Sequence, residues 1–280
     1  MEQTEHLADR IQKEIASFPG KVQLLYREYG KAAEGLCLGA EEPVVSASTI
    51  KVPILMGLLD KAKSESISLQ TPVPVRERDI LPDSKVFEYG SRRASLYELA
   101  VWMIVNSDNT STNVLISYLG MDWLNSYFQN VGLSCTRLER YMLDFDAVAH
   151  GKNNYISPAD FCRCLERWKE AESEDPYASL ALSILRRNRD WDALCRYLYE
   201  DLSIPHKTGG LDGIEHDAGF IEQKGDYYFL GIFVSEFEPS EAMSLEAQKL
   251  MGRVSRMIFD ERGTQNGETG VGNRSQRLSV

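Results

Sequence analysis

The chain has 280 residues, of which 43% are hydrophobic and 26% charged, and its formal net charge is −11. This is the composition of an ordinary globular protein, long enough for one large domain or two lobes. The acidic balance argues against a nucleic-acid partner, because no basic field is available to attract phosphates. No run of about eighteen apolar residues occurs, so we expect no membrane span.

The N-terminus and the cysteines bear on the compartment. Residues 1–10 are charged and lack the basic and apolar segments of a secretory signal. We therefore expect a cytoplasmic protein, or a secreted one if the numbering is that of a mature form. Cys162 and Cys164 have no second cysteine pair to complete a zinc site, which predicts reduced thiols and no metal. We also expect no cofactor and a monomer.

The first part of the chain predicts a helix and two strands. Leu7, Ile11 and Ile15 recur at four-residue steps, which is typical of an amphipathic helix. The expected elements are a helix over 4–17 capped by Thr4, strands over Val22–Tyr26 and Gly35–Gly39 joined by a turn at 29–31, and a helix that begins near Ser48.

The middle of the chain is predicted to be helical. Ser95 followed by Glu98 is a capping-box pattern, and Pro158 stands in a first-turn position after Ser157. We expect helices over Leu96–Val105, Thr110–Leu119, Met121–Val131, from Ser157 onward, Ala178–Leu185 and Trp191–Tyr199, with loop and short strands over 71–94 and a long irregular segment over 134–156.

The last part returns to strands. We expect strands over Ile204–Thr208, Ile214–Glu222 and Tyr227–Glu236, a hairpin turn at Gly225-Asp226, a helix over Ser240–Phe259 and a disordered tail over 263–280. The predicted fold is α+β: an antiparallel sheet flanked by the N- and C-terminal helices, beside an all-helical lobe. It forms one domain over 1–262, with a sheet lobe (1–47 and 203–262), a helical lobe (48–202) and a site in the cleft between them.

Ser48 and Lys51 are the first candidate site residues. At positions i and i+3 of a helix start they share a face. A hydroxyl beside an amine can act as a nucleophile if burial or a second cation lowers the pKa of the lysine. Taken alone, this spacing is more typical of a solvated helix start.

Two further motifs follow in the chain. Ser107-Asp108-Asn109 lies between two predicted helices, and Lys207-Thr208-Gly209-Gly210 lies on a predicted strand. Each alone fits a helix cap or a strand end. In this order, however, Ser-x-x-Lys, Ser-Asp-Asn and Lys-Thr-Gly are the motifs of class A β-lactamases and penicillin-binding proteins. The chain resembles the class A β-lactamase-like serine hydrolases over most of its length, with Ser95–Ala100 and Thr136–Arg140 also similar to family segments.

The resemblance implies the family fold, which agrees with the predicted layout, and a small-molecule substrate: a β-lactam or a related amide or ester. It also implies a role for each motif residue. Ser48 would be the acylated nucleophile, and Lys51 would accept its proton or tune the network around it. Ser107 would relay a proton to the leaving nitrogen, and Asn109 would bind the substrate amide. The substrate carboxylate would be bound by Lys207, Thr208 and Gly209, and the N–H groups of Ser48 and Gly210 would form the oxyanion hole. Lys207 would also help to lower the pKa of Lys51.

One departure from the family separates two functions. Met142 stands where the family has the glutamate that activates the deacylating water, and a thioether cannot take a proton from water. Asp144 or Asp146 could substitute only with a different loop path. Asn154 stands where the family has an aspartate, and the loop is one residue short before Pro158. We therefore expect a hydrolase with slow deacylation; the alternatives are a penicillin-binding or sensing module without efficient turnover and an inactive descendant.

The remaining candidates are histidines. His216 and Asp217 are adjacent on a predicted strand and could form a dyad at the cleft, although a structural pair is the stronger interpretation. His6 and His150 fit the surface.

Overall fold

The computed structural model describes residues 6–29, 35–90, 92–223 and 226–270. Its helices are α1 (Leu7–Ala16), the 3₁₀ turn η1 (Ala47–Ile50), α2 (Lys51–Ser64), the 3₁₀ turn η2 (Glu77–Asp79), α3 (Leu96–Val105), α4 (Asn109–Leu119), α5 (Met121–Asn130), α6 (Phe145–Ala149), α7 (Pro158–Ala171), α8 (Pro176–Leu185) and α9 (Glu241–Gly270). Its strands are β1 (Lys21–Glu28), β2 (Gly35–Leu38), β3 (Val44–Val45), β4 (Pro72–Val75), β5 (Arg92–Ser95), β6 (Tyr155–Ile156), β7 (His206–Leu211), β8 (Ile214–Gln223) and β9 (Asp226–Ser235).

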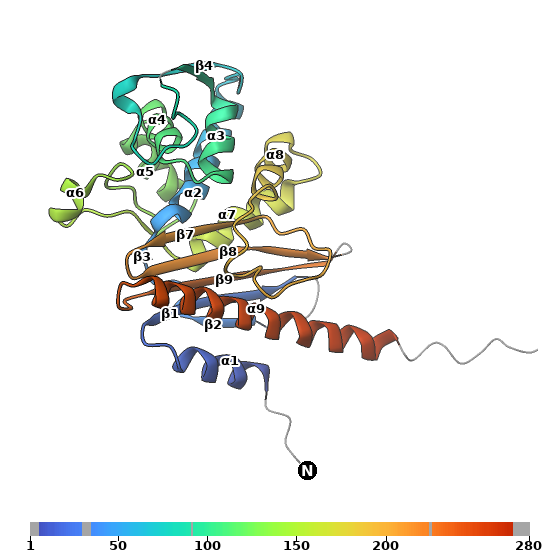
Figure 1. Cartoon of the computed structure of the whole chain (residues 1–280). Helices are drawn as coiled ribbons and strands as arrows, with labels where there is room; N and C mark the ends of the chain where they lie inside the picture. Colours follow the sequence, from blue (N-terminus) through green and yellow to red (C-terminus); the bar gives the residue numbers. More distant parts are fainter. Residues whose placement is uncertain (1–5, 30–34, 91, 224–225, 271–280) are drawn as a thin grey trace, which may run out of the picture.

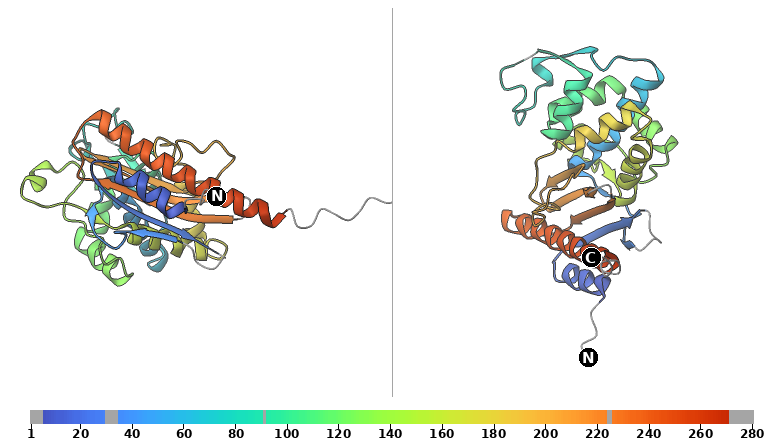
Figure 2. Two further views of the ribbon diagram at one scale, coloured as in Figure 1. Left: turned by 90° about the horizontal axis from the view of Figure 1, so that it is seen from below. Right: turned by 90° about the vertical axis from the view of Figure 1, so that its right-hand side faces the viewer.

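An antiparallel sheet divides the molecule into layers. Within the described residues it has five strands in the order β2-β1-β9-β8-β7, so the N-terminal hairpin joins the C-terminal strands. Helices α1 and α9 cover one face, and α7 lies on the other face, below the remaining helices (Figures 1 and 2). This is the predicted α+β fold, and it leaves β7 at the edge of the sheet beside η1.

Both faces of the sheet are buried, because successive side chains of a strand point to opposite faces. Leu24 and Ile232 belong to the core shared with α1 and α9. Their neighbours Leu25 and Phe233 belong to the larger core shared with the helical layer. The strands therefore connect two apolar cores, and burial of both holds the terminal helices and the helical layer on one sheet.

Local signals placed several helix starts correctly. At α3 the Ser95 Oγ accepts from the Glu98 N–H at 3.2 Å, and the Ser95 N–H donates to Glu98 Oε2 at 2.8 Å, which completes the predicted capping box. Ser157 caps α7, whose first residue is Pro158. Ser48 lies in η1, which runs directly into α2, so the predicted helix starts as one 3₁₀ turn.

The predicted helix over Trp191–Tyr199 is wrong. This segment forms turns, with the Arg196 N–H bonded to the Ala193 carbonyl at 3.1 Å. The reason is tertiary: the Leu194 N–H donates to the buried Asp217 carboxylate at 3.1 Å, and so it is not available for helical pairing.

The ends of the chain differ partly from expectation. Helix α9 continues to Gly270, past residue 263, where the sequence predicted a tail; residues 271–280 lie outside the described part, as do Thr4 and much of the two predicted turns. All five cysteines fall in the described part and are free. No helix in that part is both long and apolar enough to span a bilayer. The lobe boundaries and the monomeric state stay predictions.

Candidate active site

The three motifs meet where the edge strand β7 passes the start of α2. A Cβ placed on Gly209 would lie 3.0 Å from Ser48 N and 3.1 Å from Thr49 N, so the strand runs in close contact with the backbone of η1. Ala47, just before Ser48, has a φ of 45°, in the left-handed region that non-glycine residues rarely adopt. The turn that carries Ser48 is therefore strained at Ala47, and it packs against Gly209 of the strand.

Lys51 is the centre of the site. Its side chain is fully buried, and its Nζ lies 3.0 Å from Ser48 Oγ and 3.1 Å from Ser107 Oγ. It also donates to the Ser107 carbonyl at 2.7 Å and to Asn109 Oδ1 at 2.8 Å. These two oxygens can only accept, so they take both hydrogens of a neutral amine. The lone pair of the Lys51 nitrogen is then free to accept a hydrogen bond from the hydroxyl of Ser48 or Ser107.

The electrostatics favour that neutral amine. Burial, and then the nearby Lys207, hold the pKa of Lys51 well below its ordinary value, although Asp108 and Asp83 oppose the shift. Burial also lowers the pKa of Lys207, to about 8, with Asp190 and Asp217 acting in the opposite direction. The lowered pKa favours the neutral form of Lys51, whereas Lys207, with a pKa of about 8, is largely protonated at pH 7.

Ser107 joins the two lysines. Its Oγ lies 3.1 Å from Lys51 Nζ and accepts from Lys207 Nζ at 3.2 Å. Its φ of 51° is again in the left-handed region, and this conformation turns both its carbonyl and its hydroxyl toward Lys51. The hydroxyl is thus placed to pass a proton between the lysines and a bound ligand.

Asn109 and Thr208 each meet a carboxylate that the sequence analysis did not identify. Asn109 Nδ2 donates to Asp83 Oδ2 at 2.7 Å, which orients the amide whose oxygen binds Lys51. Thr208 Oγ1 donates to Asp190 Oδ2 at 2.7 Å. Both aspartates lie in loops far from the motifs in sequence, and no local pattern distinguishes them from solvated loop residues.

The loop at Met142 offers no carboxylate from that position. Met142 is buried in the larger core, and its N–H donates to Asn113 Oδ1 at 2.7 Å. Asp144 Oδ1 accepts from the Ala147 N–H at 2.9 Å as the N-cap of α6, and Asp146 is exposed on that helix. Helix α6 lies at an outer edge of the molecule in Figure 1. Asp144 is thus engaged as a helix cap, and Asp146 is exposed to solvent.

Asn154 ties the base of this loop to the turn before Ser48. Its Oδ1 accepts from the N–H groups of Glu139 and Arg140 at 2.8 and 3.1 Å, and its carbonyl accepts from the Ser46 N–H at 2.8 Å. A neutral amide here satisfies backbone groups, and Arg140 instead donates from its Nε to Asn153 Oδ1 at 2.9 Å.

The His216-Asp217 dyad is corrected by the structure. The two side chains point to opposite faces of β8, because they are adjacent on a strand. Asp217 pairs instead with His206, with Nδ1 and Oδ1 2.8 Å apart and both residues fully buried. Burial lowers the pKa of His206, but the Asp217 charge outweighs it and raises the pKa to about 10. His216 packs against Phe233 and contacts the Val45 carbonyl. His6 and His150 are exposed, as predicted.

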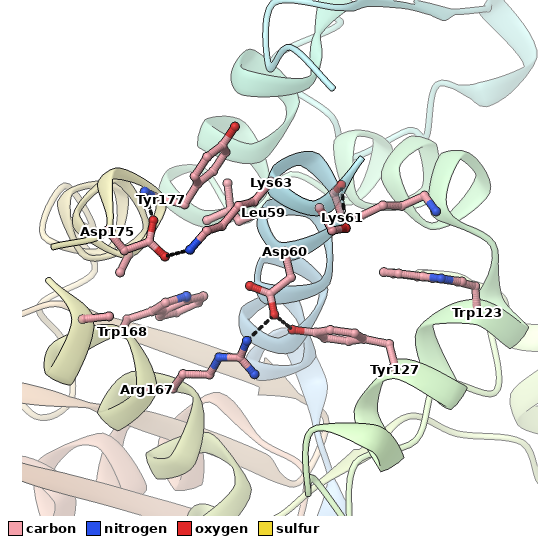
Figure 3. Close-up of a pocket in the computed structure, with 13 residues that line it drawn as sticks. Leu59, Asp60, Lys61, Lys63, Trp123, Tyr127, Arg167, Trp168, Asp175 and Tyr177 are labelled. Atoms are coloured by element: carbon pink, nitrogen blue, oxygen red, sulfur yellow. Dashed lines mark hydrogen bonds and ion pairs between the residues drawn. The ribbon is translucent and has the colours of Figure 1, made fainter. Parts of the chain in front are cut away.

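A separate pocket of about 750 Å³ lies beside the C-terminal half of α2 (Figure 3). In it Asp60 lies between Tyr127 and Arg167 and accepts a hydrogen bond from each at 2.6 Å. Lys63 pairs with Asp175 at 2.8 Å. None of the motif residues lines this pocket, and each of its charged groups has a partner, which for Lys61 is Glu65 outside the lining.

Comparison with known proteins gives a consistent result. Residues 6–261 match the Beta-lactamase2 family, described as the beta-lactamase enzyme family. The chain is 28% identical over 227 residues to a beta-lactamase of Rhodobacter capsulatus, which covers 79% of this chain and 78% of the relative. It is 25% identical over 235 residues to a beta-lactamase of Bacteroides uniformis, with coverages of 76% and 77%.

Solved structures share the fold. A beta-lactamase from Chitinophaga pinensis superposes with a TM-score of 0.83 at 19% identity, over 92% of this chain and 100% of that one. The structure of PBP-A superposes with a TM-score of 0.82 at 27% identity, over 92% and 96%.

Proposed function

The chain belongs to the beta-lactamase enzyme family of serine hydrolases, and we propose that Ser48 is acylated by a β-lactam or a related amide or ester, with slow deacylation. In the acylation step, Ser48 Oγ bonds to the acyl carbon and the carbon–nitrogen or carbon–oxygen bond to the leaving group breaks. The hydroxyl proton passes to Lys51 and reaches the leaving group through Ser107. The N–H groups of Ser48 and Gly210 stabilise the oxyanion.

One observation carries the acylation proposal. A buried lysine with a depressed pKa lies 3.0 Å from Ser48 Oγ, and two carbonyl-type oxygens take its hydrogens. An amine in this state can accept the proton that the nucleophile must lose. Substrate binding by Asn109, Lys207, Thr208 and Gly209 belongs to the same proposal.

Slow deacylation is supported by the loop at Met142. A deacylating water needs a base within hydrogen-bond reach, and Met142 is an apolar core residue while Asp144 caps α6. A solved structure with 27% identity is described as a mutant of PBP-A in an acyl-enzyme complex with penicillin G. That similarity favours the second candidate function, a penicillin-binding or sensing module that is acylated without efficient turnover.

The first test follows the mass of the intact protein after mixing with penicillin G. We expect a stoichiometric adduct that forms faster than it decays, and no adduct in Ser48→Ala. A burst of product followed by slow turnover should accompany it. An adduct that persists in Ser48→Ala would contradict the assignment, and rapid turnover without a burst would contradict slow deacylation.

The second test restores a carboxylate. Met142→Glu should raise the deacylation rate tenfold or more while the acylation rate stays within a fewfold, because only the second step needs the activated water. Single-turnover kinetics separate the two steps. Met142→Gln is the matched control, because it has similar size without a base. Equal deacylation rates in the two variants would show that this position does not face the acyl group.

A further inference from the structure

The loop after α8 holds a carboxylate against the strand of the candidate site. Asp190 Oδ2 accepts from Thr208 Oγ1 at 2.7 Å. Asn188 fixes this loop to β7, since its Nδ2 donates to the His206 carbonyl at 3.2 Å and its Oδ1 accepts from the Asp190 N–H at 3.1 Å. Asp190 is therefore a positioned charge at the ligand-facing hydroxyl of the strand.

The charge of Asp190 acts on two neighbouring groups of the sheet. The pKa of Glu215, which lies opposite Gly210 across β7 and β8, is raised by burial and also by Asp190. Lys207 is the buried cation of the strand, and the charge of Asp190 is among those that raise its pKa. An incoming carboxylate would need the Thr208 hydroxyl and the positive charge of Lys207. Asp190 already accepts the hydrogen bond of that hydroxyl and interacts with that charge.

We propose that Asp190 determines specificity: it selects acyl donors that present a neutral or cationic group, and not a carboxylate, to Thr208. An anion there must displace Asp190 and then lie close to it. Repulsion between like charges about 4 Å apart in water weakens the binding constant roughly fivefold, and the effect is larger where water is excluded. This inference rests on the proposed acylation of Ser48, and it departs from the carboxylate subsite that the family resemblance implies.

The test compares penicillin G with its methyl ester, which have the same β-lactam ring. Acylation of Ser48 is followed by intact mass at concentrations below saturation. We expect the wild type to react faster with the ester. Asp190→Asn keeps a hydrogen-bond acceptor without the charge, and it should shift the ester-to-acid rate ratio at least tenfold toward the acid. The ester rate itself should stay within a fewfold.

Two variants act as controls. Asp190→Glu keeps the charge and should keep the preference for the ester. Asp192→Asn removes an exposed carboxylate two residues away and should leave the ratio unchanged. The combination separates the charge of Asp190 from its size and from the net charge of the loop.

Three results would overturn the inference. One is a ratio in Asp190→Asn within twofold of the wild type, with Ser48 acylated by both compounds. Another is an equal loss of both rates in that variant, which would assign Asp190 a structural role only. Failure of both compounds to acylate wild-type Ser48 would contradict the proposed function itself, and the selection with it.

Discussion

At the scale of single residues, acylation should depend on Lys51 as the group that accepts the proton of Ser48. Lys51→Ala should slow acylation by about 10²–10⁴-fold, the usual contribution of a positioned proton acceptor. Lys63→Ala, on the same helix but paired with Asp175 at the surface, is the control and should react normally. Stopped-flow acylation with a chromogenic β-lactam measures both. An unchanged rate in Lys51→Ala would show that another group accepts the proton.

The pKa of Lys207 predicts how the rate depends on pH. Its ammonium, with a pKa of about 8, bonds Ser107 and lowers the pKa of Lys51. Lys207 carries its charge below this pKa and loses it above, so the acylation rate should fall as the pH rises through about 8. Lys207→Arg keeps the charge at all these pH values and should move the alkaline fall upward. An alkaline limb that does not move would assign it to a different group.

At the scale of elements, the contact between β7 and η1 sets the geometry of the site. Gly209→Ala places a Cβ 3.0 Å from Ser48 N, and because the neighbour is backbone, the strand or the turn must shift. We expect at least tenfold slower acylation and a loss of about 1–3 kcal/mol of unfolding free energy. In Gly210→Ala the Cβ meets the nearest Glu215 oxygen at 3.5 Å, an ordinary contact, so this matched variant should fold normally. Equal stability and acylation in Gly209→Ala would contradict the close packing.

At the scale of the whole molecule, a buried ion pair links β7 to β8 and to the turn before them. Asp217 contacts both His206 and the Leu194 N–H, so Asp217→Asn should cost about 3–5 kcal/mol, the usual result of leaving one charge of a buried pair. The control is Asp212→Asn, an exposed residue of the β7–β8 turn. Urea unfolding measures both; a loss below about 1 kcal/mol in Asp217→Asn would contradict a stabilising pair.

The same pair predicts a pH dependence. The folded pKa of His206, about 10, lies above its ordinary 6.5, so the pair stabilises fully below pH 6.5 and loses this contribution as the pH rises through about 10. The stability difference between wild type and Asp217→Asn should therefore shrink over that range. Comparing the two proteins at each pH cancels the contributions of groups on which Asp217 does not act. Lys207, whose pKa is raised by Asp217, changes the difference in the same direction as His206. A difference that stays constant to pH 10 would show that His206 is neutral.

The sequence by itself determined most of the helices and strands, and it determined the three motifs. Capping residues and hydrophobic periodicity depend on neighbours within a few residues, so α3, α7 and the strands of the sheet could be predicted locally. The order of the three motifs likewise identified Ser48, Lys51 and Ser107 as candidates, together with the family.

Only the tertiary structure decided how remote side chains meet. The depressed pKa of Lys51 depends on burial and on Lys207, which the packing of β7 against η1 brings close. The turns over Trp191–Tyr199 depend on the contact of Leu194 with Asp217. The carboxylate beside Thr208 is that of Asp190, and the path of its loop brings it there. Such contacts follow from strand register and the path of loops, which local propensity does not specify, because long-range packing overrides weak local preferences.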